Sequence, residues 1–118
     1  MLFQVKSGYV SVVGGIHKGE FVAVEPCETS KGKAWRWKFK ITEGKEAGKI
    51  VCELSDGENP PTPANKTGRF LSALASKPLN DGDSIEVAQY VGKPYMLVVE
   101  AKPNGKPGET RLTTFSAI

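Results

Sequence analysis

Short segments of alternating apolar and polar residues, separated by Gly, Pro and Asn, follow one another along most of the chain. A period of two is typical of β-strands with one buried face, and Gly, Pro and Asn favour turns between strands. Residues 83–87 are predicted as a short strand or an extended loop. The clear strands are expected over 20–29, 34–42, 49–54, 94–102 and 110–118.

One segment, residues 65–77 (NKTGRFLSALASK), carries apolar residues at helical spacing instead. Asn65 is suited to cap the start of this helix and Pro78 to stop it. Gly68 is expected to weaken the first turn by about 1 kcal/mol relative to Ala.

The resulting order is three strands, a helix and two strands. It predicts an all-β protein with one helix: a five-stranded Greek-key OB-fold barrel with the helix between strands three and four. An SH3-like or other small β-barrel is the alternative, and the position of the helix argues against it. Residues 1–118 are expected to form a single domain, with residues 1–19 as an N-terminal arm or extra strand. Pro26 cannot donate to a ladder, so it predicts an edge position or a bulge in the first strand.

Residues 34–42 (AWRWKFKIT) form the strongest predicted strand. Its odd-numbered positions are aromatic or aliphatic, and its even-numbered positions between them are cationic. Each large apolar side chain contributes about 1.5–3 kcal/mol when it is fully buried, so the apolar face is expected to look inward. Arg36, Lys38 and Lys40 then point outward at intervals of about 6.5–7 Å.

Charge is concentrated in the same region. The chain has a formal net charge of +3, but residues 31–49 hold seven basic and two acidic residues, which leaves the remainder at −2. A row of cations on one strand matches a polyanion such as nucleic acid. A solvated strand face that discourages edge pairing explains the same row, and the charge pattern does not decide between them.

Residues near the predicted final turn extend the candidate surface, because OB-folds bind oligonucleotides with the strand two–three face and the loops beside it. Aromatic rings that stack on bases are the second feature of single-strand binders. Trp35 is expected to look inward but to be partly accessible at the start of its strand. The last two strands are apolar on both faces, which fits helix cover, a subunit interface or a stacking surface. These considerations add Lys102, Lys106 and Arg111 as cations, and Trp35, Tyr95 and Phe115 as stacking candidates.

No catalytic or metal-binding signature is present. Two cysteines and one histidine are too few for a four-ligand zinc site, and no phosphate-binding glycine motif occurs. We therefore expect no enzymatic activity, no cofactor and no metal. Cys27 and Cys52 fall on the first and third predicted strands, about 9–10 Å apart, whereas bridged Cα atoms rarely exceed about 7 Å. Both are expected to be buried, reduced thiols.

Membrane insertion and secretion are not expected. No apolar run approaches the roughly 20 residues of a membrane helix, and the first residues lack the apolar core of a secretory signal. Together with reduced cysteines, this predicts a cytoplasmic protein.

The runs WRWKFKITEGKEAGKIVCEL, NKTGRFLSAL and YVGKPYMLVVEAKPNGK show a family resemblance. The chain resembles small OB-fold single-stranded-DNA-binding proteins encoded by phages and by phage-derived bacterial genes. The similarity covers about residues 20–115, mainly at turn glycines and apolar core positions. It includes the glycine hairpin of residues 43–49, the helix start at 68–74 and the strand at 91–100.

The resemblance implies binding of single-stranded DNA without sequence preference, in replication or recombination. The sequence itself leaves RNA open as an alternative ligand. Carried over by position, the implied contacts are Arg36, Lys38 and Lys40, with Lys31 and Lys33 in the preceding loop. The chain departs from many such proteins in having no acidic residue after Glu109, so partner recruitment through an acidic tail is not expected. A protein-interaction or phage accessory β-barrel without nucleic-acid binding is the competing hypothesis, and homo-oligomer formation stays open.

Overall fold

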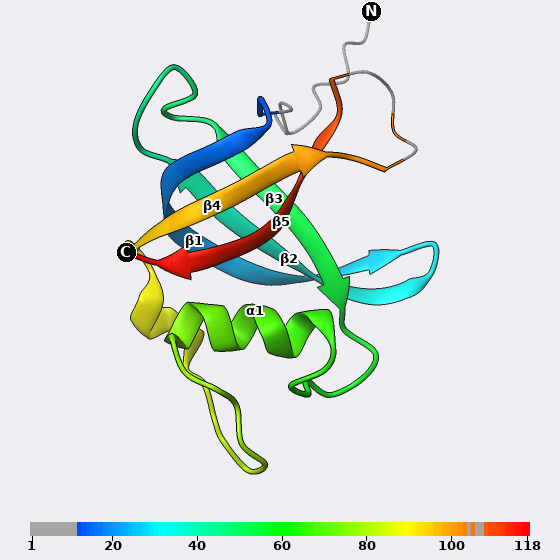
Figure 1. Ribbon diagram of the computed structural model, residues 1–118. Coiled ribbons are helices and arrows are strands. Elements are labelled where there is room, and N and C mark those ends of the chain that lie inside the picture. Colours follow the sequence, from blue (N-terminus) through cyan, green and yellow to red (C-terminus); the bar gives the residue numbers. More distant parts are fainter. Residues whose placement is uncertain (1–11, 104, 106–107) are drawn as a thin grey trace, which may run out of the picture.

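The computed structural model describes residues 12–103, 105 and 108–118. These residues form five antiparallel strands in one sheet, an α-helix and a short 3₁₀ helix (Figure 1). This confirms the predicted mostly-β fold, with the α-helix between the third and fourth strands. The elements are β1 (Gly15–Thr29), β2 (Gly32–Ile41), β3 (Ile50–Asp56), α1 (Lys66–Ala75), η1 (Val87–Tyr90), β4 (Pro94–Ala101) and β5 (Thr110–Ala117).

The sheet has the strand order β3-β2-β1-β4-β5, so β3 and β5 are its edges. The sheet curves until Cα atoms of β3 and β5 come within 8 Å of each other, and Figure 1 shows the two strands crossing. No ladder joins them among the described residues, and α1 contacts both. The prediction of a closed barrel is therefore wrong for the hydrogen-bonded sheet, which is curved and open.

The long strand β1 pairs with two different strands along its length. Its residues 15–20 pair with β4, and its residues 19–29 pair with β2, with a register shift between Phe21 and Ala23. Pro26 therefore lies where β1 has a neighbour on one side only, as its missing N–H predicted. Residues 15–19 were expected to belong to an N-terminal arm or extra strand, and they form the beginning of β1. A Cβ on Gly19 would lie 2.8 Å from the carbonyl oxygen of Lys40, so glycine is needed at this strand crossing.

The core lies between the inner face of the sheet and α1. Trp37, Phe39 and Ile41 are completely buried, which confirms the alternation predicted for β2. Trp37 Nε1 donates to Ser55 Oγ at 2.8 Å, so its indole is satisfied in the interior. Phe70 packs edge-on against Trp37 at 5.2 Å between ring centroids, which joins α1 to the sheet.

The helix α1 begins as predicted, with Asn65 as its N-cap. The side-chain oxygen Asn65 Oδ1 accepts from the backbone N–H of Gly68 at 2.8 Å. The helix ends two residues earlier than expected, because Ser76 adopts a left-handed conformation with φ of 56°. Residues 83–86 form no strand and lead into η1. Neither α1 nor η1 has the length and apolar character that a membrane-spanning helix requires.

Candidate nucleic-acid interface

The outer face of β2 presents the three predicted cations, with different degrees of exposure. Lys40 is exposed, whereas Arg36 and Lys38 are partly buried. Glu20 lies opposite Lys40 on β1, and Glu25 lies opposite Arg36. Lys38 Nζ is 2.8 Å from Glu25 Oε1, so the middle cation of the row is held in an ion pair. The row is therefore not uniformly positive, because β1 places carboxylates along one side of it.

On its other side, the row borders an apolar strip of β3. The register places Ile50, Cys52 and Leu54 opposite Lys40, Lys38 and Arg36. Leu54 is 41% exposed, which is unusual for a leucine in a strand. This strip was not predicted, although the alternation of residues 50–54 carries the signal for it.

The β1–β2 hairpin holds Lys31 and Lys33 at its tip. Thr29 Oγ1 accepts from the backbone N–H of Lys31 at 3.2 Å and donates to the carbonyl oxygen of Gly32 at 2.9 Å. Lys33 donates its backbone N–H to Glu58 Oε1 at 2.7 Å. The hairpin backbone is thus fixed, while both lysine side chains are exposed and form no ion pair with any described residue.

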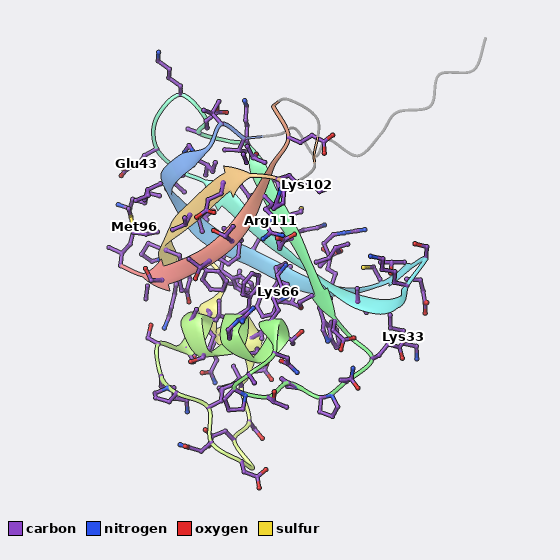
Figure 2. The ribbon with its side chains drawn as sticks, turned by 45° about the vertical axis from the view of Figure 1, so that its right-hand side comes forward. Lys33, Glu43, Lys66, Met96, Lys102 and Arg111 are labelled. Atoms are coloured by element: carbon purple, nitrogen blue, oxygen red, sulfur yellow. The ribbon has the colours of Figure 1, made fainter. Side chains whose placement is uncertain are left out.

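A hollow of about 490 Å³ lies between the hairpin tip and the end of β3, lined by Lys31, Lys33 and Lys66 among others. Figure 2 shows Lys33 on the hairpin and Lys66 on α1. Lys66 Nζ is 3.1 Å from Glu53 Oε2 and 5.6 Å from the centre of the Phe70 ring. Lys66 was missed from the sequence, because only the packing of α1 against the sheet brings it beside the hairpin.

The cations predicted near the β4–β5 turn form a separate group. Lys102 is exposed and lies 3.8 Å from Glu109 Oε2. Arg111 is exposed opposite Glu100, without an ion pair among the described residues. In Figure 2 both Lys102 and Arg111 lie apart from Lys33. Lys106 falls outside the described residues.

Two of the three stacking candidates are core residues. Tyr95 is 1% exposed and Phe115 is 3% exposed, so neither ring offers a face to a ligand. Tyr95 donates its hydroxyl to the carbonyl oxygen of Leu74 at 2.7 Å, and burial raises the pKa of Tyr95. Phe115 lies 4.6 Å from Phe39 between ring centroids. Both candidates are therefore corrected: these rings stabilise the core. Trp35 alone of the three is partly exposed, as predicted.

The cysteines occupy the strands expected for them. Cys27 lies on β1 and Cys52 on β3, with β2 between them, and both remain thiols. Each is partly exposed, so the expectation that they are buried is wrong. Within residues 12–103, 105 and 108–118, no group of three or more His, Cys, Asp or Glu side chains is arranged to hold a metal ion.

Asp56, in the hollow beside the hairpin, serves a local role. Its side chain accepts hydrogen bonds from Asn59 Nδ2 and from the backbone N–H of Glu58, each at 2.7 Å. The hydrogen bond from Asn59 is the main cause that lowers the pKa of Asp56. The carboxylate thus holds the turn after β3.

The site therefore combines exposed lysines, a hollow beside the hairpin and partly exposed apolar side chains. A scan against protein-family models and a search of curated proteins found no match to this sequence.

Proposed function

We propose that this protein binds single-stranded nucleic acid, with DNA as the primary ligand, and catalyses no reaction. The observation that carries the proposal is the exposure of Lys31, Lys33, Lys40 and Arg111 without ion pairs among the described residues. Cations that are not already neutralised bind phosphates and release counterions from the strand, which drives sequence-independent affinity.

The arrangement of strands supports the same proposal. OB-folds bind oligonucleotides on the face of their second and third strands and with the loops after strands one and four. Here β2 and β3 carry the cations and the apolar strip, and the hairpin after β1 carries Lys31 and Lys33. We assign the curved, open sheet to the OB class, in line with the resemblance to phage-type single-stranded-DNA-binding proteins. A cytoplasmic role in replication or recombination belongs to this proposal.

These cations lie on both faces of β2, because Lys33 shares the face of Trp35 and Trp37 and Lys40 shares the outer face of Arg36 and Lys38. Their contributions differ. Lys31, Lys33 and Lys40 meet phosphates directly, because their ammonium groups face solvent. Lys38 contributes less, because Glu25 competes with a phosphate for it. The exposed Leu54 provides an apolar contact for sugars or bases beside the charges.

The test is a titration with an oligothymidylate of about 16 nucleotides, within the range bound by one OB-fold, at several salt concentrations. The double substitution Lys31→Ala, Lys33→Ala should weaken binding and reduce the log–log salt slope by about 0.7 for each phosphate that the variant no longer neutralises. Lys77→Ala, an exposed lysine after α1, is the matched control and should bind as the wild type does.

Duplex DNA of the same length should bind more weakly than the single strand. Wild-type affinity and salt slope in a correctly folded double variant would contradict the assignment of the hairpin. Failure of the wild type to retain the single strand at low salt would contradict the function itself.

One observation favours a second candidate, a protein-interaction module. Ile16 is 66% and Met96 is 37% exposed on the outer face of β1 and β4, and Ile16 lies opposite Val98. α1 does not cover this face, so cover by a helix does not explain why β4 is apolar on both faces. Size-exclusion chromatography with light scattering, with and without oligonucleotide, separates the candidates: this one predicts a stable oligomer and no bound oligonucleotide.

A further inference from the structure

A cavity of about 200 Å³ opens on the inner side of β1 and β2, where the hairpin extends past α1. Its walls are almost entirely apolar and come from the two strands, the segment before α1, α1 itself and η1. The side chains that shape it are Val24, Trp35, Pro61, Leu71 and Val87. An apolar cavity of about 150 Å³ is large enough to bind benzene, so this one has room for a single six-membered ring.

The polar groups at the back of the cavity are already satisfied. Trp37 Nε1 donates to Ser55 Oγ, and Thr67 Oγ1 lies 2.7 Å from both Ser55 Oγ and the carbonyl oxygen of Asp56. Trp35 differs, because its ring lines the cavity and is partly exposed. The cavity is therefore suited to a flat, aromatic group in contact with Trp35, and unsuited to an ion.

A path lined by lysines and carboxylates leads to this cavity. Trp35 also lines a second hollow, of about 290 Å³, together with Lys33. Lys33 in turn lines the hollow of about 490 Å³ that contains Lys31 and Lys66. The hollow of about 290 Å³ thus shares Trp35 with the apolar cavity and Lys33 with the hollow that contains Lys31 and Lys66.

The carboxylates along this path keep their negative charge, although two of them accept hydrogen bonds from neutral N–H groups. Glu58 Oε1 accepts from the backbone N–H of Lys33, and Asp56 accepts from Glu58 and Asn59. Glu28 lies on β1 opposite Lys33 and lines the middle hollow. The side chains of Lys31 and Lys33 are exposed beside these carboxylates, so phosphates that follow an aromatic ring into the cavity can contact the two lysines.

We propose that this cavity receives one unstacked pyrimidine base of the bound strand, which stacks on Trp35 while neighbouring phosphates contact Lys31 and Lys33. The inference rests on the proposed function and identifies a base as the part of the strand that the cavity binds. A base inside a duplex would have to leave its stack to enter, so the cavity selects single strands. Every pyrimidine presents a ring face, so the selection is for strandedness and not for sequence.

The experiment compares an oligothymidylate of about 16 nucleotides with a deoxyribose-phosphate polymer of equal length that lacks bases. Trp35→Ala should weaken binding of the oligothymidylate about 5- to 140-fold, the range expected when one base–aromatic stack is removed. Binding of the base-free polymer should not change. Met96→Ala, an exposed apolar position on β4, is the matched control and should leave both affinities unchanged.

Fluorescence gives an independent readout. Oligothymidylate should quench the wild-type protein, and the base-free polymer should not. The quench should disappear in Trp35→Phe, because the remaining Trp37 is completely buried. Val87→Phe, which fills the cavity from η1 and keeps Trp35, should reproduce the loss of affinity and covers the case in which Trp35→Ala does not fold.

The outcomes separate the two proposals. Equal binding of oligothymidylate by the wild type and by folded Trp35→Ala and Val87→Phe, without a Trp35-dependent quench, overturns the base cavity and leaves single-strand binding intact. No retention of oligothymidylate by the wild type at low salt overturns both.

Discussion

Lys38 Nζ lies 2.8 Å from Glu25 Oε1 across the β1–β2 ladder. The two residues form a diagonal pair, because the residue directly opposite Glu25 in the register is Arg36. The lysine side chain is 22% exposed and the glutamate 44%, so the pair sits at the surface of the proposed interface. Exposed ion pairs contribute at most about 1 kcal/mol to stability, so breaking this pair should change the free energy of unfolding little. Under the proposed function, Glu25 competes with a phosphate of the bound strand for Lys38.

Glu25→Gln should therefore tighten binding of single-stranded DNA. Removing the carboxylate takes away a negative charge that repels a phosphate beside Lys38, and the log–log salt slope should increase by about 0.7 for each further phosphate neutralised. The measurement is the salt titration with oligothymidylate. Asp81→Asn is the matched control, because it removes an exposed carboxylate from the turn between α1 and η1, away from β2. Weaker or unchanged binding in Glu25→Gln would argue against the outer face of β2 as a contact surface.

Ser55→Ala should destabilise the fold. Ser55 Oγ is the acceptor for the buried indole N–H of Trp37 and lies 2.7 Å from Thr67 Oγ1. A buried donor without an acceptor costs about 1–3 kcal/mol, and the free energy of unfolding should fall by that amount in a urea titration. Ser84→Ala, at an exposed position, should change it by less than about 0.5 kcal/mol. If Ser55→Ala also lowered the free energy of unfolding by less than about 0.5 kcal/mol, a water molecule would be replacing the serine hydroxyl as the acceptor for Trp37.

Gly68→Ala should also destabilise, although Ala favours a helix by about 1 kcal/mol over Gly. A Cβ at this position would lie 1.7 Å from the carbonyl oxygen of Thr62, so the segment before α1 would have to move. Overpacking of this kind costs about 1–3 kcal/mol or more, which exceeds the gain in propensity. Thermal unfolding of Gly68→Ala beside Arg69→Ala, an exposed neighbour in the same helix, measures the difference. A higher melting temperature in Gly68→Ala would refute the close packing.

The stability of the protein should depend on Glu46 at acidic pH. The hydrogen bond from Lys49 is the main cause that lowers the pKa of Glu46 below its usual 4.5, against a raising effect of burial. A depressed pKa stabilises the folded state above the ordinary value, and this contribution is lost as the pH falls through the folded pKa. At pH 7 the wild type should therefore have a larger free energy of unfolding than Glu46→Gln. This difference should shrink as the pH falls below 4.5. If the free energies of unfolding of the two proteins differed by the same amount across this pH range, protonation of Glu46 would not be coupled to folding.

Local patterns in the sequence were sufficient for much of the fold. The alternation in residues 34–42 correctly placed the rings of Trp37 and Phe39 inside and the cations outside, because neighbouring side chains of a strand must point to opposite faces. Asn65 identified the start of α1, since capping depends on residues three positions apart. Pro26 correctly indicated a stretch of β1 with a neighbour on one side only.

Contacts between distant segments decided the rest. No local pattern shows that Tyr95 and Phe115 join Phe39 in the core, because β4 and β5 are apolar on both faces. Likewise, the pairing of Glu25 with Lys38 and the position of Lys66 beside the hairpin depend on strand register and on the docking of α1.

The sequence by itself thus determined which side chains share a face, because the periods of strand and helix are properties of the local backbone. Only the tertiary structure decided which cations keep their charge available, which rings stay accessible and whether the sheet closes. Those outcomes depend on what lies across the ladder or beneath the helix, and such neighbours are separated along the chain by turns whose geometry the residue pattern does not specify.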